Sequence, residues 1–135
     1  ERQKRIAIST DQIVVQLTIF FWKRLFSPDY EATLWKPALR GLFPNKAIGR
    51  AVVSTHLESL YDARNRIAHH EPMHGKRLRE ALKAIDFVIE NFERRSPDPN
   101  SLLARLTADK RADLRREVAA LEALLAAFRS RDAGT

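Results

Sequence analysis

Residues 46–72 read KAIGRAVVSTHLESLYDARNRIAHHEP, and the fold we predict is built around them. Large apolar residues recur in this stretch at alternating intervals of four and three, which is the period of one helix face: Val53, Leu57, Leu60, then position 64, then Ile67. Pro72 lacks the backbone N–H that a helix interior requires, so the helix should end at Glu71-Pro72. We predict a helix over residues 46–70 with Asn45 as its N-cap.

Arg64 occupies the position on this face where the spacing predicts a leucine. A guanidinium on an apolar helix face is costly to bury unless another charge pairs with it. The interruption falls within residues 64–72, Arg-Asn-Arg-Ile-Ala-His-His-Glu-Pro, where groups that bind phosphate or transfer protons are densest in the sequence. We therefore interpret Arg64 as a functional residue.

Helices are also predicted before residue 46. Ser9 caps a helix over residues 11–26, which is so rich in large apolar side chains that we expect it to be central or to face a second subunit. A short helix starts at Ser27-Pro28 and ends near residue 35, and a loop with one helical turn follows. Three aromatic residues in these segments are interpreted as core residues rather than as surfaces for base stacking: Tyr30, Trp35 and Phe43.

After Pro72, Gly75 completes a turn before a helix over residues 76–95. Its apolar face is Leu78, Leu82, Ile85, Ile89 and Phe92. A hinge over residues 96–100 and a short helix over residues 101–106 lead to Thr107, the predicted N-cap of a last helix over residues 108–130. The matching periods predict an all-α bundle of about four to five main helices, with short connecting helices, packed at shallow angles.

The composition agrees with a single helical domain over residues 1–135, with a basic lead-in over residues 1–10. The chain is 44% hydrophobic, and no apolar run approaches the roughly 18 residues that span a membrane, so we expect no membrane partner. The absence of cysteine excludes disulfides and fits a cytoplasmic protein. The net charge of +7 favours polyanionic partners, with nucleic acid first and an anionic membrane surface second. Because residue 1 is not Met, we expect further sequence before it.

Residues 64–72 hold the groups needed for metal-independent cleavage of RNA through attack of its own 2′-hydroxyl. Imidazole transfers protons near neutral pH, and arginine stabilises the charge that develops on a phosphate. Asn65 and His69 share a helix face, as do Arg66 and His70. Arg64 and His69 lie about 140° apart around an ideal helix. Either the helix distorts, or the two act together across two chains, and we favour a symmetric dimer.

A metal site is a weaker interpretation of these histidines. His69, His70 and His74 lie near Glu71 in the sequence. Adjacent histidines on a helix diverge, however, and no H-x-x-x-H spacing is present. We predict no metal and no cofactor.

A purely structural interpretation places His69 and His70 at the helix C-terminal dipole, with Asp62–Arg66 as a surface ion pair. We accept the ion pair for Arg66, but it does not account for Arg64. His56 is predicted to be a half-buried packing residue.

The pattern Arg64-Asn65-x-x-x-His69 resembles the R-x4–6-H signature of the HEPN superfamily (higher eukaryotes and prokaryotes nucleotide-binding domains). The whole string over residues 64–72 resembles the Abi-like (abortive infection) branch. The aromatic segment over residues 13–26, Leu34-Trp35 and Phe43-Pro44 are also similar to that branch, so the resemblance covers about residues 11–92. The branch usually has further helical sequence before the aromatic helix, which is absent here, and the resemblance does not extend to the last helix.

The resemblance implies a helical bundle that dimerises across the motif helix and acts as a metal-independent endoribonuclease. It also implies a role in phage defence or in a toxin–antitoxin system, with RNA as substrate and a cognate antitoxin protein as partner. By position, Arg64 and His69 are the expected catalytic pair, and Asn65 orients His69 or the phosphate. His70 assists catalysis and Glu71 supports it.

A second hypothesis is a non-catalytic basic module that binds RNA or a partner protein. Its binding would be salt-sensitive and would yield no product. The candidate RNA-binding residues are Arg66, Lys76, Arg77, Arg79 and Lys83. A third hypothesis, a purely structural helical dimer, predicts neither binding nor cleavage.

Overall fold

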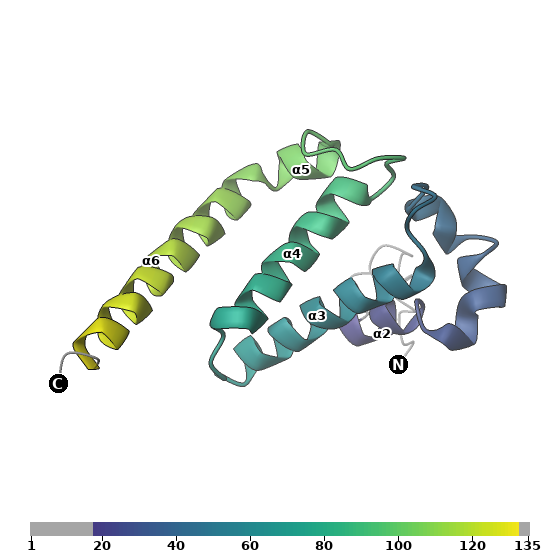
Figure 1. Cartoon of the computed structure of the whole chain (residues 1–135). Helices are drawn as coiled ribbons and strands as arrows, with labels where there is room; N and C mark the ends of the chain where they lie inside the picture. Colours follow the sequence, from purple (N-terminus) through teal and green to yellow (C-terminus); the bar gives the residue numbers. More distant parts are fainter. Residues whose placement is uncertain (1–17, 133–135) are drawn as a thin grey trace, which may run out of the picture.

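The computed structural model describes residues 18–132, and over that range the chain contains helices and no strand. Figure 1 shows how the elements are arranged. They are α2 (Ile19–Arg24), η1 (Pro28–Tyr30), η2 (Glu31–Trp35), η3 (Leu39–Leu42), α3 (Arg50–Ala68), α4 (Gly75–Asn91), α5 (Leu102–Leu106) and α6 (Ala108–Asp132). The described helices include none with the length and apolar character to cross a membrane. The predicted all-α fold is confirmed, and the predicted cap Ser9 lies outside the described residues.

Helices α3 and α4 form a hairpin at the centre of the fold (Figure 1). Alanine side chains allow helices to approach closely, and Ala81 and Ala84 of α4 are both buried. Three residues of the predicted apolar face of α4 are only half-buried: Leu78, Leu82 and Ile85. From the predicted face, Ile89 is buried and Phe92 packs against the core. The buried side of α4 therefore includes part of the predicted face and adds two alanines, which a pattern of large apolar residues overlooks.

Phe43 lies at the centre of an aromatic core. Its ring stacks on Phe87 of α4 with 6.2 Å between centroids. It meets the rings of Phe26 and Phe92 edge-on at 6.3 and 6.0 Å. Such ring pairs contribute roughly 0.5–1.5 kcal/mol each beyond the burial of area. Phe43 is 3% exposed and Trp35 4%, so their predicted core role is confirmed. Tyr30 is half-buried.

The segment before α3 is wound differently from the single short helix predicted there. A 3-10 turn over residues 28–30 passes into a π-helical turn, in which the N–H of Lys36 donates to the carbonyl of Glu31 at 3.1 Å. The guanidinium of Arg50 pairs with the carboxylate of Glu31 and donates to the carbonyl of Phe26 at 2.9 Å. The first residue of α3 is therefore fixed to the turn that carries Trp35 into the core.

Helix α3 begins at Arg50 rather than at residue 46, and its N-cap is Gly49. The predicted cap, Asn45, has another role: its side-chain oxygen accepts from the N–H of Ala47 at 3.0 Å. That contact closes a local Asx turn before the helix. The prediction of Asn45 as the cap was wrong because its side chain satisfies the nearer backbone donor.

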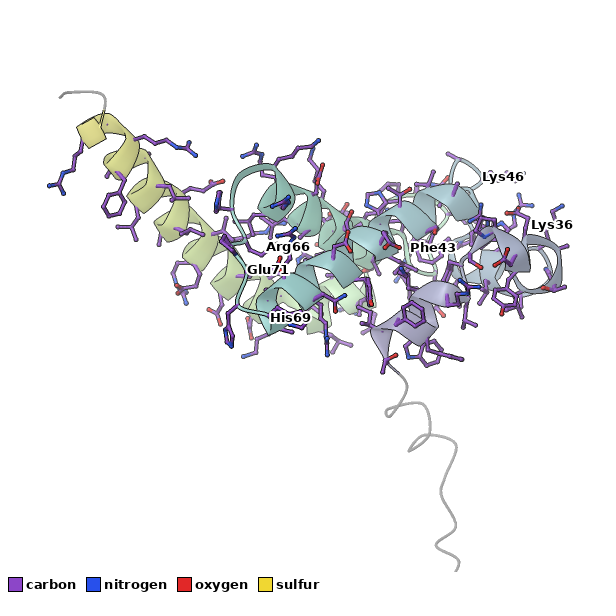
Figure 2. All side chains as sticks on the ribbon, turned by 90° about the horizontal axis from the view of Figure 1, so that it is seen from below. Lys36, Phe43, Lys46, Arg66, His69 and Glu71 are labelled. Atoms are coloured by element: carbon purple, nitrogen blue, oxygen red, sulfur yellow. The ribbon has the colours of Figure 1, made fainter. Side chains whose placement is uncertain are left out.

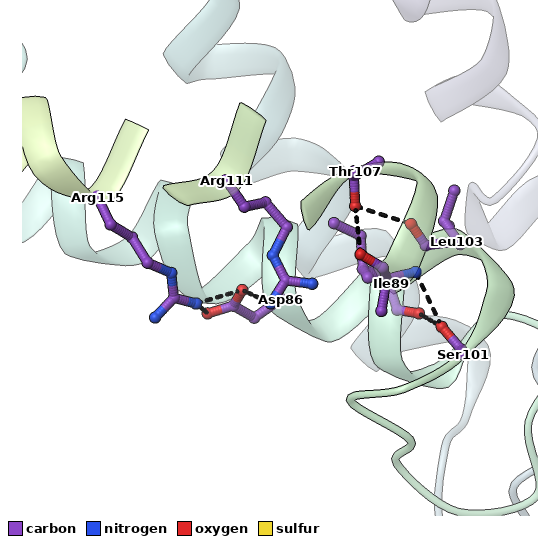
Figure 3. Close-up of polar contacts among 8 residues, drawn as sticks. Asp86, Ile89, Ser101, Leu103, Thr107, Arg111 and Arg115 are labelled. Atoms are coloured by element: carbon purple, nitrogen blue, oxygen red, sulfur yellow. Dashed lines mark hydrogen bonds and ion pairs between the residues drawn. The ribbon is translucent and has the colours of Figure 1, made fainter. Parts of the chain in front are cut away.

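The C-terminal half of the chain differs from prediction at two joints. Helix α4 ends at Asn91 rather than near residue 95, and the N–H of Glu93 donates to the carbonyl of Leu42 at 2.7 Å. Thr107 directly precedes α6, as predicted, and its carbonyl accepts from the N–H of Arg111 at 2.9 Å. Its side chain does not cap that helix, since its hydroxyl donates back to the carbonyl of Leu103 at 2.8 Å (Figure 3). Ser101 caps α5, accepting from the N–H of Ala104.

Helix α6 follows the predicted span but diverges from α4 as it leaves α5 (Figure 1). Its apolar side chains are largely exposed, including Leu124 at 60% and Phe128 at 61%. The described part of the chain therefore does not bury the predicted apolar face of this helix.

Replacement of Phe43 by alanine should lower the free energy of unfolding by about 3–5 kcal/mol, because the side chain leaves a cavity among three other rings. Phe21→Ala is the matched control, since that ring is 41% exposed, and should cost about 1 kcal/mol or less. Urea unfolding followed by circular dichroism measures both. Equal losses would contradict the central place given to Phe43.

Candidate functional site

The end of α3 is a Schellman motif that presents His69 and Glu71 beside the helix. The N–H of Glu71 donates to the carbonyl of Arg66 at 2.8 Å. The N–H of His70 donates to the carbonyl of Ile67 at 3.1 Å. These two bonds satisfy carbonyls that a helix end otherwise leaves unpaired. The motif requires a left-handed residue after the cap, and His70 takes that conformation at φ 54.

A pocket of about 460 Å³ lies between the end of α3 and the start of α4. We call it the motif pocket. Figure 2 shows Arg66, His69 and Glu71 at this end of α3, with Phe43 toward the other end. The residues that line the motif pocket are Ser59, Asp62, Ala63, Asn65, Arg66, His69, Glu71, Met73, Arg77 and Glu80. The pocket thus brings one imidazole together with two guanidinium groups and three carboxylates.

Arg66 forms an ion pair with Glu71, with 2.8 Å between the guanidinium nitrogen and the carboxylate oxygen. The predicted partner Asp62 lines the same pocket but forms no ion pair with Arg66 in the described chain. The surface pair Asp62–Arg66 was therefore a wrong prediction. The Schellman turn decides the partner, because it brings residue 71 back over residue 66.

Arg64 and His69 are not brought together within one chain. His69 lines the motif pocket, whereas Arg64 is absent from its lining and is exposed. The guanidinium of Arg64 donates to the side-chain oxygen of Asn65 at 3.2 Å. Ile67 on the same face is 63% exposed. The expectation of a costly buried charge at position 64 is corrected, because the apolar face of α3 leaves the core before it reaches that residue.

The predicted basic residues of α4 all lie on its exposed surface: Lys76, Arg77, Arg79 and Lys83. Arg77 also lines the motif pocket. Lys76 forms an ion pair with Glu80 at 3.6 Å, which is an exposed contact of little energetic weight. The remaining basic side chains are therefore available to a polyanion without a change of fold.

Sequence reasoning did not find the acidic and apolar lining of the pocket, Asp62, Met73 and Glu80. A signal was present, because Ser59, Asp62, Arg66 and His69 recur at intervals of three and four and so share one polar face of α3. Among residues 18–132, no group of three or more His, Asp or Glu side chains is placed to hold a metal ion.

His56 is a half-buried packing residue, as predicted. Its ring stacks on Phe87 with 3.9 Å between centroids. Burial lowers the pKa of His56 from its usual 6.5, because the charged imidazolium is poorly solvated there.

Comparisons with protein-family models, with curated proteins and with solved structures found no match to this chain.

Acidification should weaken the fold through His56. Its pKa is lower in the folded chain, so the unfolded state binds more protons and the free energy of unfolding falls as the pH drops below about 6.5. His56→Gln should flatten this dependence while losing the ring contact. Urea midpoints between pH 5 and pH 7.5 test this, and an unchanged slope in the variant would contradict it.

His70→Gly should raise the free energy of unfolding by about 0.5–1 kcal/mol. A left-handed conformation is strained for histidine but not for glycine, so the substitution removes that strain from the folded state. Glycine also has more conformational freedom in the unfolded chain, and this loss of stability offsets only part of the gain. His70→Ala keeps the left-handed strain and should give no gain. Thermal or urea midpoints distinguish the two variants, and equal destabilisation of both would show that the imidazole itself supports the turn.

Proposed function

We propose that this protein is a metal-independent endoribonuclease of the HEPN type, acting in phage defence or in a toxin–antitoxin system. The observation that carries the proposal is the placement of His69 in one pocket with Arg66 and Arg77. The net charge of +7 and the exposed basic side chains of α4 also favour an RNA substrate. A cognate antitoxin protein would be its regulatory partner.

The reaction requires a base, an acid and a stabiliser of negative charge. A base takes the proton of the 2′-hydroxyl, whose oxygen attacks the adjacent phosphorus. The bond from phosphorus to the 5′-oxygen breaks, and an acid protonates that leaving oxygen. His69 fits the proton-transfer role, with His70 assisting, and guanidinium groups stabilise the charge on the phosphoryl oxygens.

Arg64 enters this site from a second chain in our proposal. Within one chain it does not line the motif pocket and is exposed. A two-fold dimer across the end of α3 would set Arg64 of each chain near His69 of the other. Asn65 would hold Arg64 in position through the contact they make at 3.2 Å.

Glu71 sets a condition on substrate binding. It neutralises Arg66 in the described chain, so an RNA phosphate must either displace the carboxylate or use Arg77 first. The pair is partly exposed, with 30% of the Arg66 side chain and 48% of the Glu71 side chain accessible. Solvent therefore screens it, and exchange with a phosphate costs little.

A non-catalytic RNA-binding module is the second candidate. The exposed row Lys76, Arg79 and Lys83 favours it, since these side chains lie outside the motif pocket and can contact phosphates without any chemistry. Its binding would fall steeply with salt and would not depend on His69.

His69→Ala should lower RNA cleavage by at least about 100-fold, because the pocket loses its only histidine. His74→Ala is the matched control, as it removes an exposed histidine five residues away that does not line the pocket. Cleavage of a mixed RNA pool is measured with and without EDTA. Cleavage abolished by EDTA, or undiminished in His69→Ala, would overturn the proposal, and binding without product would favour the second candidate.

The shared site has its own test. Arg64→Ala and His69→Ala should each be inactive, and their mixture should regain about a quarter of wild-type cleavage, since random pairing rebuilds one intact site in half of the dimers. A mixture as inactive as its components would contradict a site built from two chains.

A further inference from the structure

Helix α6 carries a second feature of the molecule that the proposed function does not use. We define the α6 apolar face as Leu114, Val118, Leu121, Leu125 and Phe128. Leu121 is 36% exposed and Phe128 61%, and Leu124 widens the same surface at 60%. Leu114 is also 36% exposed, whereas Val118 and Leu125 are half-buried. Apolar side chains left accessible along one helix in this way mark an interaction surface.

Two arginines attach the beginning of α6 to α4. The guanidinium of Arg115 donates to both carboxylate oxygens of Asp86 at 2.8 Å, and Arg111 approaches the same carboxylate at 3.7 Å (Figure 3). Beyond Arg115 the helix continues to residue 132 and diverges from α4 (Figure 1). The greater part of the α6 apolar face thus lies on a projecting helix.

The spacing of this face is that of a coiled coil. Its residues alternate at intervals of four and three, which places Val118 and Leu125 at a positions and Leu114, Leu121 and Phe128 at d positions. Charged residues flank the row at the neighbouring e and g positions, where they set the direction of pairing. They include Arg115 and Glu122 at e and Lys110 and Glu117 at g.

We propose that α6 pairs with α6 of a second copy of this chain as an antiparallel coiled coil. A parallel pair would place Glu117 opposite Glu122 of the second copy, and Lys110 opposite Arg115 of the second copy, so that like charges meet four times. In an antiparallel pair, Val118 lies against Leu121 of the second copy. Arg115 then lies opposite Glu122 of the second copy, and by symmetry this contact of opposite charges forms once for each chain. Charge complementarity therefore favours a second α6 as the partner of this face and favours the antiparallel orientation of the two helices.

This register also matches the apolar residues. Leu114 packs against Leu125 of the second copy, and Phe128 lies against Arg111 of the second copy, where a guanidinium and a ring attract each other. Lys110 and Arg131 of the second copy are like charges, but they meet at the solvated ends where salt screens them. The guanidinium of Arg115 has five N–H donors, enough for Asp86 and for a second carboxylate.

Cysteine crosslinking tests the direction directly, because the chain contains no cysteine of its own. Leu114→Cys and Leu125→Cys are prepared separately with different tags and oxidised alone and mixed. The antiparallel register predicts a disulfide between the two variants in the mixture and little in either variant alone. Crosslinking of each variant with itself would indicate a parallel pair and overturn the proposal, as would no crosslinking at all.

Association is measured on the full chain by sedimentation over a range of concentrations. Leu121→Asp should remove one association step or weaken it by at least about tenfold, while Ala123→Asp, on the opposite face of α6, should not. Unchanged association in Leu121→Asp would overturn the proposal and would place any dimer elsewhere.

A charge exchange separates the intermolecular contact from the pairing of Arg115 with Asp86. Arg115→Glu and Glu122→Arg should each weaken association, and the double variant should restore it. Failure of the double variant to recover would contradict the register. No residue of the motif pocket is altered in these tests, so RNA cleavage can fail or persist independently of them.

Discussion

The contact of Phe43 with Phe26, Phe87 and Phe92 is the interaction on which the rest of the structure depends. It joins the segment after α2, the loop before α3 and the C-terminal half of α4 around one ring. Arg50 adds a polar link beside it, through Glu31 and the carbonyl of Phe26. Because the α3–α4 hairpin is held here, its other end is free to be built from polar side chains.

That other end carries the candidate site and is stabilised by different forces. Few residues are buried there, and the chain reverses through backbone hydrogen bonds rather than through packing. A histidine in a left-handed conformation stands at the turn, where glycine would be less costly. A locally unfavourable residue at such a position is consistent with a role for the side chain itself, and it makes this turn the place where stability and function compete.

One carboxylate of α4 pairs with two arginines of the last helix. The carboxylate is that of Asp86, and the arginines, Arg111 and Arg115, lie near the beginning of α6. Partly exposed ion pairs contribute little energy. These contacts leave Leu124 and Phe128 of α6 exposed. The motif pocket and the α6 apolar face share no residue.

The sequence alone determined the helical class, the spans of α5 and α6, the core role of Trp35 and Phe43, and the end of α3 before Pro72. These depend on local periodicity, on strong helix-breaking residues and on the burial of aromatic rings. The start of α3 was predicted wrongly, because Asn45 satisfies a nearer donor. The start of α6 was predicted correctly, but the Thr107 hydroxyl bonds backwards to α5 instead of capping α6. Such choices between competing local hydrogen bonds are not visible in residue spacing.

Only the tertiary structure decided which groups of the motif meet. The sequence placed Arg64 on an apolar face and therefore in a core, but that face is exposed beyond Leu60 and the arginine with it. The chain brings Arg66, His69 and Glu71 into one pocket because the helix ends in a Schellman turn, which folds residue 71 back over residue 66. Periodicity gives the direction of a side chain around its own helix, whereas the burial of that side chain depends on which other elements pack against that face of the helix.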